Sequence, residues 1–167
     1  MRKLKYTFKS GILFKMTFVK YKHLLKRLVA AVLKIAVEEI EEFVILNSEI
    51  APEAVDKKFC RLDIHLKVNG QYVDVEMQVA NKGNFAERLL VYWSKVFGGA
   101  LGSGDDCAVV PKAILICFIN FDLFDCEEYC SEFVCMEKHR YELLTDKMSI
   151  FVFELANCRR KLILPTS

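Results

Sequence analysis

The sequence predicts an α/β fold in which a mixed β-sheet is flanked by α-helices. Three observations predict it: two alternating apolar runs that meet at Asn69-Gly70, a continuous apolar run at residues 113–119, and apolar residues at helical spacing in residues 22–37 and 84–97. Alternation is typical of paired strands with one buried face, and a continuous run is typical of a strand buried on both faces. Helical and strand segments therefore follow one another along the chain, as they do when helices pack against a sheet.

The first 37 residues predict a basic helical arm. They contain ten Lys or Arg and no acid, which leaves 14 basic against 22 acidic residues, a net charge of −8, in residues 38–167. Within the arm, residues 22–37 have the apolar stripe of an amphipathic helix, and Lys22, Lys26 and Arg27 are among its basic residues. A basic arm on an acidic body favours a polyanionic partner, and a solvated helix face is the alternative.

Composition indicates one globular domain, residues 1–167, of 53% hydrophobic and 28% charged residues. Seven cysteines at irregular spacing indicate reduced thiols in a cytoplasmic protein. A zinc site is the alternative for four of these side chains, but their spacings do not fit the usual paired pattern: Cys126, Cys130, Cys135 and His139. No apolar run reaches ~18 residues, so neither a transmembrane helix nor a membrane partner is expected.

A short β-prone run at residues 43–46 is followed by a predicted hairpin at residues 61–79. Asn69-Gly70 favours a type I′ turn, because both central residues of that turn need a positive φ. With these two residues as the loop, Val68 faces Gln71. This register gives an apolar face that consists of Leu62, Ile64, Leu66, Val68, Val73, Val75 and Met77.

The polar face of the hairpin predicts a site. In the same register the facing pairs are His65 and Asp74, Asp63 and Glu76, and Arg61 and Gln78. Facing Cβ atoms lie ~4.5–5.5 Å apart, where like charges are destabilising. The facing carboxylates therefore indicate a divalent cation such as Mg²⁺ between them, and a solvated polar face is the alternative. His65 and Asp74 are expected to form a surface pair beside this site.

Residues 84–97 form the clearest predicted helix. Asn84 is a favourable N-cap and Glu87 follows three residues later, as in a capping box. The helix is expected to end at Gly98-Gly99. Beyond it, strands are expected at residues 113–119, 133–136 and 150–155.

One edge of this predicted helix carries Arg88, Tyr92 and Lys95, at positions i, i+4 and i+7. We expect these side chains to contact phosphate or charge that develops during a reaction. The alternatives are that Tyr92 packs in the core with its hydroxyl outward and that Lys95 is a solvated lysine.

An Asp on one strand, Glu-x-Gln on the next and a helix with Arg-x-x-x-Tyr resemble the PD-(D/E)XK nuclease family transposases. These include the recombination-promoting nucleases of bacterial mobile elements. The segments that carry the resemblance are Leu62-Asp63-Ile64, Val75-Glu76-Met77-Gln78 and the helix segment 88–93. Weaker likeness extends it over residues 12–157, at 13–15, 114–124 and 144–155.

The resemblance implies a restriction-endonuclease-like core and hydrolysis of DNA phosphodiester bonds with Mg²⁺ or Mn²⁺. Asp63 and Glu76 match the two metal ligands of the family. Gln78 matches the third motif position, which is Lys in the wider superfamily. A lysine stabilises developing charge, whereas a neutral amide can only orient the attacking water. The acid that many members carry on the first helix has no evident counterpart, since residues 12–37 contain no carboxylate.

The sequence therefore predicts a metal-dependent DNA endonuclease of a mobile-element family. The basic arm would follow the DNA backbone independently of sequence, and the resemblance implies a possible homodimer. The rival is a catalytically inactive nucleic-acid-binding remnant, truncated because family members usually have a further C-terminal region. A third interpretation, a protein-interaction module, leaves the facing carboxylates unexplained. The presence of Asp63, Glu76 and Gln78 on one face favours the enzyme.

Overall fold

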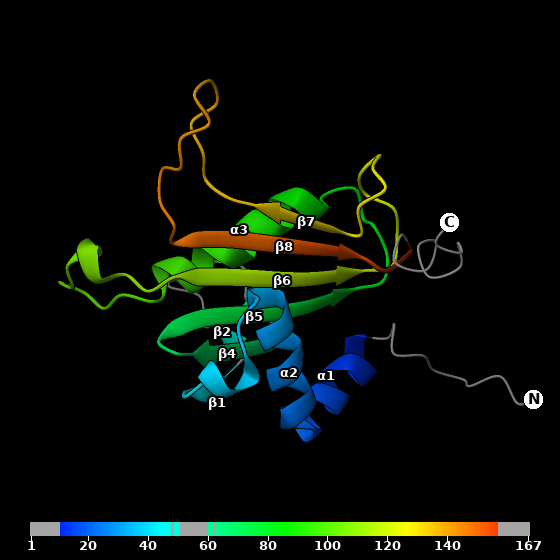
Figure 1. The fold of residues 1–167 in the computed structure, drawn as a ribbon, viewed down its shortest axis with the longest axis horizontal. Coiled ribbons are helices and arrows are strands. Elements are labelled where there is room, and N and C mark those ends of the chain that lie inside the picture. Colours follow the sequence, from blue (N-terminus) through cyan, green and yellow to red (C-terminus); the bar gives the residue numbers. More distant parts are fainter. Residues whose placement is uncertain (1–10, 48, 51–59, 62, 157–167) are drawn as a thin grey trace, which may run out of the picture.

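A mixed six-stranded sheet with helices on both faces forms the centre of the protein (Figure 1). The computed structural model describes residues 11–47, 49–50, 60–61 and 63–156. β5 and β6 are parallel, as are β6 and β8, and the other neighbours are antiparallel. In sheet order the strands are β1 (Phe43–Ile45), β4 (Ile64–Val68), β5 (Gln71–Gln78), β6 (Ala113–Ile119), β8 (Met148–Glu154) and β7 (Cys130–Phe133). The predicted mixed sheet is confirmed.

The hairpin turn has the predicted residues and register. Asn69 and Gly70 have φ of 47° and 77°, and Val68 pairs with Gln71. The Asn69 side chain also holds the segment before β1: its Oδ1 accepts the N–H groups of Glu41 and Glu42, at 2.9 and 3.0 Å. The turn is thus fixed by its backbone conformation and by a side-chain clamp.

The antiparallel ladder of β4 and β5 ends at Ile64 and Val75, earlier than predicted. Asp63 ends it, because its Oδ2 accepts the N–H of Met77 (3.0 Å), which a continued ladder would have used. The predicted pair of Arg61 with Gln78 is therefore wrong. Arg61 instead pairs with Glu49, in a two-stranded sheet of β2 (Glu49–Ile50) and β3 (Cys60–Arg61).

Helices α1 (Gly11–Lys20) and α2 (Lys22–Leu33) cover the apolar face of the hairpin. The prediction that the second helix continues to residue 37 is wrong. Lys34 adopts a left-handed conformation (φ 57°), and the N–H of Ile35 donates to the carbonyl of Ala30, which ends α2. Ile35 still packs against the core, so its apolar character did not require a longer helix.

Helix α3 (Phe85–Gly98) covers the opposite face of the sheet, as Figure 1 shows. Phe85 and Leu89 pack on β6 and β8, and Trp93 Nε1 donates to the carbonyl of Ala113 at 3.0 Å. Asn84 is the N-cap residue, as predicted, but its side chain makes no capping hydrogen bond, so the predicted capping box does not form.

The edge strand was predicted to begin at residue 133, but β7 begins at Cys130. Residues 130–133 pair with β8, and the chain then leaves the sheet as a projecting loop, residues 134–147 (Figure 1). A bridge between Met136 and Leu143 closes this loop. The β-prone residues after Phe133 are therefore used in the loop.

The cysteines whose side chains are described, at positions 107, 117, 126, 130 and 135, form no disulfide. Among the described residues no three His, Cys, Asp or Glu side chains are arranged as a metal-binding group, which leaves the zinc alternative without support. In the same part of the chain no helix is both long and apolar enough to span a bilayer.

Two short helices complete the description. The 3₁₀ helix η1 (Val37–Glu39) lies between α2 and β1, and η2 (Cys107–Val109) lies between α3 and β6.

Candidate active site

Asp74 and Glu76 lie on the face of the sheet that α3 covers, and Asp63 is bonded to Glu76 just before β4 begins. Along β5 the two carboxyl groups alternate with Val73, Val75 and Met77, which pack toward α1 and α2. Asp74 is fully buried and Glu76 is 7% exposed. These two carboxyl groups are thus enclosed between sheet and helix, whereas Asp63 and Gln78 are only partly buried.

Asp63 and Glu76 hold each other in place. The backbone N–H of Asp63 donates to Glu76 Oε1 at 2.7 Å, and Asp63 Oδ2 accepts the N–H of Met77 at 3.0 Å. Each carboxylate therefore accepts a backbone N–H from the segment that carries the other. This brings the two acids together, as predicted, although they do so where the ladder has ended.

Gln78 and Arg88 are joined directly. Arg88 Nη2 donates to Gln78 Oε1, and Gln78 Nε2 donates to the carbonyl of Ala80 at 2.7 Å. The guanidinium of Arg88 lies 5.7 Å from the centre of the Tyr92 ring. Three residues that the sequence singled out thus form one connected row next to Glu76, from β5 to α3.

Burial and mutual repulsion change the acidity of these groups. Burial, followed by the charge of Asp63, raises the pKa of Glu76 to about 8, and the positive charge of Arg88 acts in the opposite direction. Burial also raises the pKa of Asp74 well above its ordinary value, with further contributions from Glu76 and Asp63. A positive charge at this site would stabilise the ionised forms of Glu76 and Asp74.

The expectation that His65 and Asp74 form a surface pair is wrong. They face each other across the ladder, as predicted, but Asp74 is fully buried and His65 is only 9% exposed. Burial lowers the pKa of His65. The sequence did place both residues on the face of Glu76, but the alternation pattern did not tell that α3 covers this face. Asp74 is the acid of the site that sequence reasoning missed.

The N-terminus of α1 borders the site. A Cβ atom on Gly11 would lie 3.4 Å from the carbonyl oxygen of Met77 and 3.9 Å from Asp63 Oδ2, which are ordinary contact distances. The first residue of α1 thus approaches the candidate ligands closely, and this chain has no carboxylate there.

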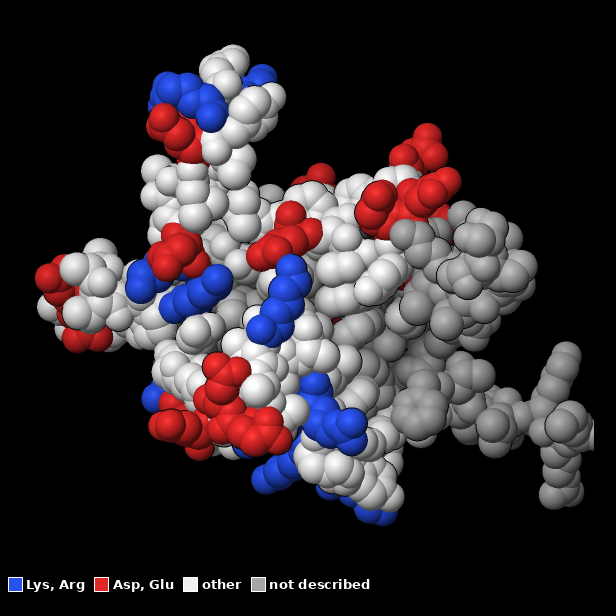
Figure 2. Space-filling view, in the orientation of Figure 1, with Lys and Arg blue, Asp and Glu red and all other residues white. Residues whose placement is uncertain are grey.

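Other predicted contact residues lie apart from the carboxylates. Lys95 is half-buried, two turns beyond Arg88 on α3. Lys22, Lys26 and Arg27 are on α2, which packs on the opposite face of the sheet. Figure 2 shows this opposite face, where acidic side chains gather over η1 and β1 next to the basic side chains of α2.

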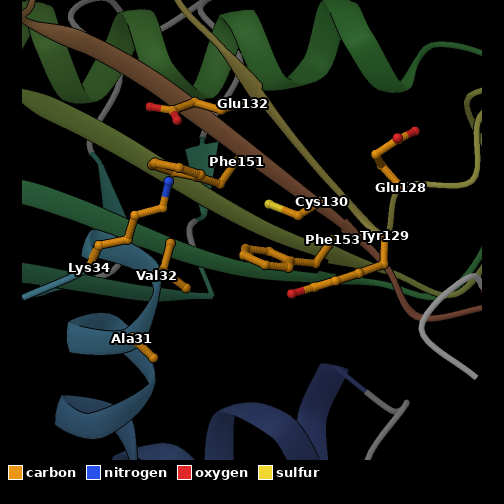
Figure 3. A pocket seen from close by; sticks show the side chains of 9 residues that line it. All are labelled: Ala31, Val32, Lys34, Glu128, Tyr129, Cys130, Glu132, Phe151 and Phe153. Atoms are coloured by element: carbon orange, nitrogen blue, oxygen red, sulfur yellow. The ribbon is translucent and has the colours of Figure 1, made fainter. Parts of the chain in front are cut away.

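A separate cavity of about 410 Å³ lies between the end of α2 and strands β7 and β8. Val32, Phe151 and Phe153 form apolar walls, and the Lys34 and Glu132 side chains lie at its rim (Figure 3). Cys130, one of the cysteines considered for a zinc site, lines this cavity, but none of the predicted active-site or DNA-contact residues does, and it lies on the α2 side of the sheet. The carboxylate cluster is therefore the better candidate for chemistry.

Comparison with known proteins agrees with this geometry. A family model described as "PD-(D/E)XK nuclease family transposase" matches residues 4–162. The chain belongs to this family. The mixed sheet with helices on both faces is consistent with the restriction-endonuclease-like fold of PD-(D/E)XK proteins. No curated protein and no solved structure matches the chain significantly.

Proposed function

We propose that this member of the PD-(D/E)XK nuclease family transposases hydrolyses DNA phosphodiester bonds with the help of a divalent cation. The observation that carries the proposal is the pair of Asp63 and Glu76, each bonded to the backbone segment that carries the other and adjacent to the Gln78–Arg88 row. Two acids held together, one buried (Glu76) and one partly buried (Asp63), destabilise a fold when both are ionised, so the arrangement is better explained by a cation-dependent reaction.

The donor set fits a hard cation. Asp63 and Glu76 supply carboxylate oxygens, and Mg²⁺ is usually held by one or two carboxylates together with water and substrate phosphate. A cation held by these carboxylates supplies Lewis-acid stabilisation of the scissile phosphate and acidifies a bound water.

Gln78 and Arg88 divide the role that a lysine has in the wider superfamily. The Gln78 amide uses one N–H for Ala80, so its second N–H can orient the attacking water. Arg88 brings a positive charge to within hydrogen-bonding distance of this amide. It would stabilise negative charge that develops on the phosphate, which a neutral Gln78 cannot do.

DNA is the proposed substrate. Arg88 contacts Gln78 and the Tyr92 ring, and it begins an edge of α3 that continues to Lys95, so we expect a phosphate backbone to approach the site along this edge. Lys22, Lys26 and Arg27 would contact DNA only beyond the edge of the sheet. A homodimer, with one site for each strand of a duplex, is part of the proposal, and light scattering with and without DNA tests it.

Nicking of supercoiled plasmid in Mg²⁺ or Mn²⁺, with an EDTA control, tests the proposal. We expect Asp63→Asn and Glu76→Gln to abolish nicking and Arg88→Gln to slow it by about 100-fold. The matched control is Glu87→Gln, which removes an exposed carboxylate next to Arg88 on α3 and should leave the rate unchanged.

The outcomes separate the nuclease from its rival. Cation-dependent nicking that both site variants lose supports the nuclease. Protein that retards DNA in a gel and never nicks it in either metal contradicts the proposal and supports an inactive nucleic-acid-binding remnant.

A further inference from the structure

Four buried side-chain atoms of the described residues have no hydrogen-bond partner, and all four lie around the candidate site. They are His65 Nδ1, both carboxyl oxygens of Asp74, and Arg88 Nε. Buried polar atoms of folded proteins are almost always paired, and exceptions concentrate at functional positions. The three residues frame Glu76: His65 and Asp74 on the hairpin, and Arg88 on α3.

The stability of the fold does not explain why a carboxyl group occupies position 74. The residue is fully buried in the centre of the sheet, with Leu115 as its neighbour on β6. An apolar side chain would suit this position, since an unpaired buried carboxyl group costs free energy. Glu154 provides a contrast on the same face: it is equally buried, but its Oε1 accepts the N–H of Leu123 at 2.7 Å. Glu154 has a structural explanation, and Asp74 has none.

The position of Asp74 in the sheet suggests a role that involves Glu76. Asp74 lies two residues before Glu76 on the same face of β5, and the charge of Glu76 contributes to the raised pKa of Asp74. On its other side it faces His65, whose ring stacks on Tyr72 at 5.7 Å with an interplanar angle of 9°. Asp74 thus lies between a rigid aromatic pair and the carboxylate that the proposed reaction requires.

We propose that Asp74 is a positioning residue of this site, which fixes the Glu76 carboxylate for cation binding and is itself fixed by His65. The inference rests on the proposed function. Asp74 acts through Glu76 and adds a third negative group to Asp63 and Glu76 when a cation is bound. A group in this role commonly changes metal affinity by about 10- to 100-fold.

Isothermal titration calorimetry with Mn²⁺ alone tests the inference, on wild type, Asp74→Asn, Asp63→Asn and Glu154→Gln. We expect Asp74→Asn to weaken Mn²⁺ binding by about tenfold or more and, above pH 8, to raise the melting temperature, because a neutral amide avoids the cost of an ionised buried carboxyl group. In plasmid nicking, kcat should fall while KM for DNA stays the same. Glu154→Gln should lower the melting temperature and leave Mn²⁺ binding unchanged.

The variants distinguish this inference from the proposed function. If Asp63→Asn loses Mn²⁺ and Asp74→Asn binds it as wild type does, the inference is overturned and the nuclease proposal stands. An equal loss in Glu154→Gln also overturns it. Wild type that binds no Mn²⁺ overturns both.

Two further variants protect the test against misfolding. Asp74→Val suits a buried strand and replaces Asp74→Asn if that variant does not fold. His65→Phe keeps a ring against Tyr72 but removes both nitrogens, and a smaller loss of Mn²⁺ affinity is expected. If His65→Phe binds Mn²⁺ with the same affinity as wild type, His65 does not help to fix Asp74.

Discussion

Asn69 fixes the end of the hairpin that lies away from the candidate site. It has a positive φ, and its side chain makes three hydrogen bonds to the segment before β1: two N–H groups donate to its Oδ1, and its Nδ2 donates to the carbonyl of Glu39 at 2.8 Å. Few side chains combine these properties, since Gly alone tolerates this φ more easily and Gly cannot form the clamp.

Substitution of Asn69 separates the two contributions. Asn69→Gly keeps the backbone conformation and loses the three hydrogen bonds, so we expect a loss of about 1–2 kcal/mol in the free energy of unfolding. Asn69→Ala loses the same hydrogen bonds and also places at positive φ a residue that tolerates this conformation less well than Asn or Gly, so it should lose about 1 kcal/mol more. Urea denaturation measures both. Equal stability of the two variants would contradict a separate cost of the turn conformation.

Glu76 predicts how the stability of the metal-free protein depends on pH. Its pKa is about 8 in the folded state, against 4.5 ordinarily, so the folded state binds a proton more tightly than the unfolded state does. The stability that this proton provides is fully present below pH 4.5 and is lost as the pH rises toward 8. Asp74, whose pKa is also raised, acts in the same direction.

We therefore expect the free energy of unfolding to fall by on the order of 3 kcal/mol as the pH is raised through this range. Glu76→Gln should flatten the dependence, because a neutral amide imitates the protonated acid. Thermal melts in EDTA from pH 5 to pH 8.5 measure it. A wild type that gains stability toward pH 8.5 would show that Glu76 is ionised in the folded protein.

The same residues show what a sequence can reveal about a site. Alternation along the hairpin predicted one face for Asp63, Asp74, Glu76 and Gln78. The Asn-Gly turn fixed the register as far as Ile64 and Val75, which includes the pair of His65 with Asp74 but not the predicted pair of Arg61 with Gln78. Alternation cannot tell whether a polar face meets water or a helix, because both leave the same pattern in the strand. The charge of Asp74 suggested water, and α3 covers it instead.

At the scale of elements, side chains and caps decided boundaries that periodicity could not. The apolar stripe of α2 continues through Ile35, yet a left-handed Lys34 ends the helix and returns Ile35 to the core. The ladder of the hairpin should have continued past Ile64, yet the Asp63 side chain takes a backbone hydrogen bond of β5. The first boundary depends on the left-handed conformation of Lys34, and the second depends on a side-chain hydrogen bond of Asp63.

The N-terminus of α1 allows a gain of function to be tested. Gly11→Asp would place a carboxylate next to Asp63 without a steric conflict, since its Cβ has only ordinary contacts. We expect this variant to melt at a lower temperature than wild type in EDTA, from repulsion, and to bind Mn²⁺ about tenfold more tightly.

Gly11→Asn is the control for this change, because it has the same shape without the charge. Both variants lose the flexibility of Gly11 in the unfolded chain, so only the charge differs between them. Equal Mn²⁺ affinity of Gly11→Asp and Gly11→Asn would place the start of α1 outside the cation site.

At the scale of the whole molecule, the sheet separates two groups of functional candidates. The carboxylates and α3 lie on one face, and the basic residues of α2 lie on the other, next to the acidic η1–β1 segment (Figure 2). DNA bound at the site would reach α2 only by passing an edge of the sheet. The basic charge of α2 is thus expected to attract DNA at long range without orienting the scissile bond.

Neutralising α2 tests this separation. The triple variant Lys22→Gln, Lys26→Gln, Arg27→Gln should weaken DNA binding by up to about tenfold at low salt and reduce the salt dependence of binding. The nicking rate at saturating DNA should not change. A filter-binding series across salt concentrations measures affinity, and a fall in the saturated rate would show that α2 helps to position the substrate.

The burial of Cys117 has a practical consequence for following this protein in solution. Its thiol is 1% exposed and pairs in register with Glu76, and burial together with the nearby acids raises its pKa. A thiol reagent can reach it only when α3 separates from the sheet, whereas Cys107 and Cys126 are exposed and react at once. The rate of the slow labelling phase would therefore report how often α3 opens and exposes the enclosed acids to solvent. A bound cation should lower this rate.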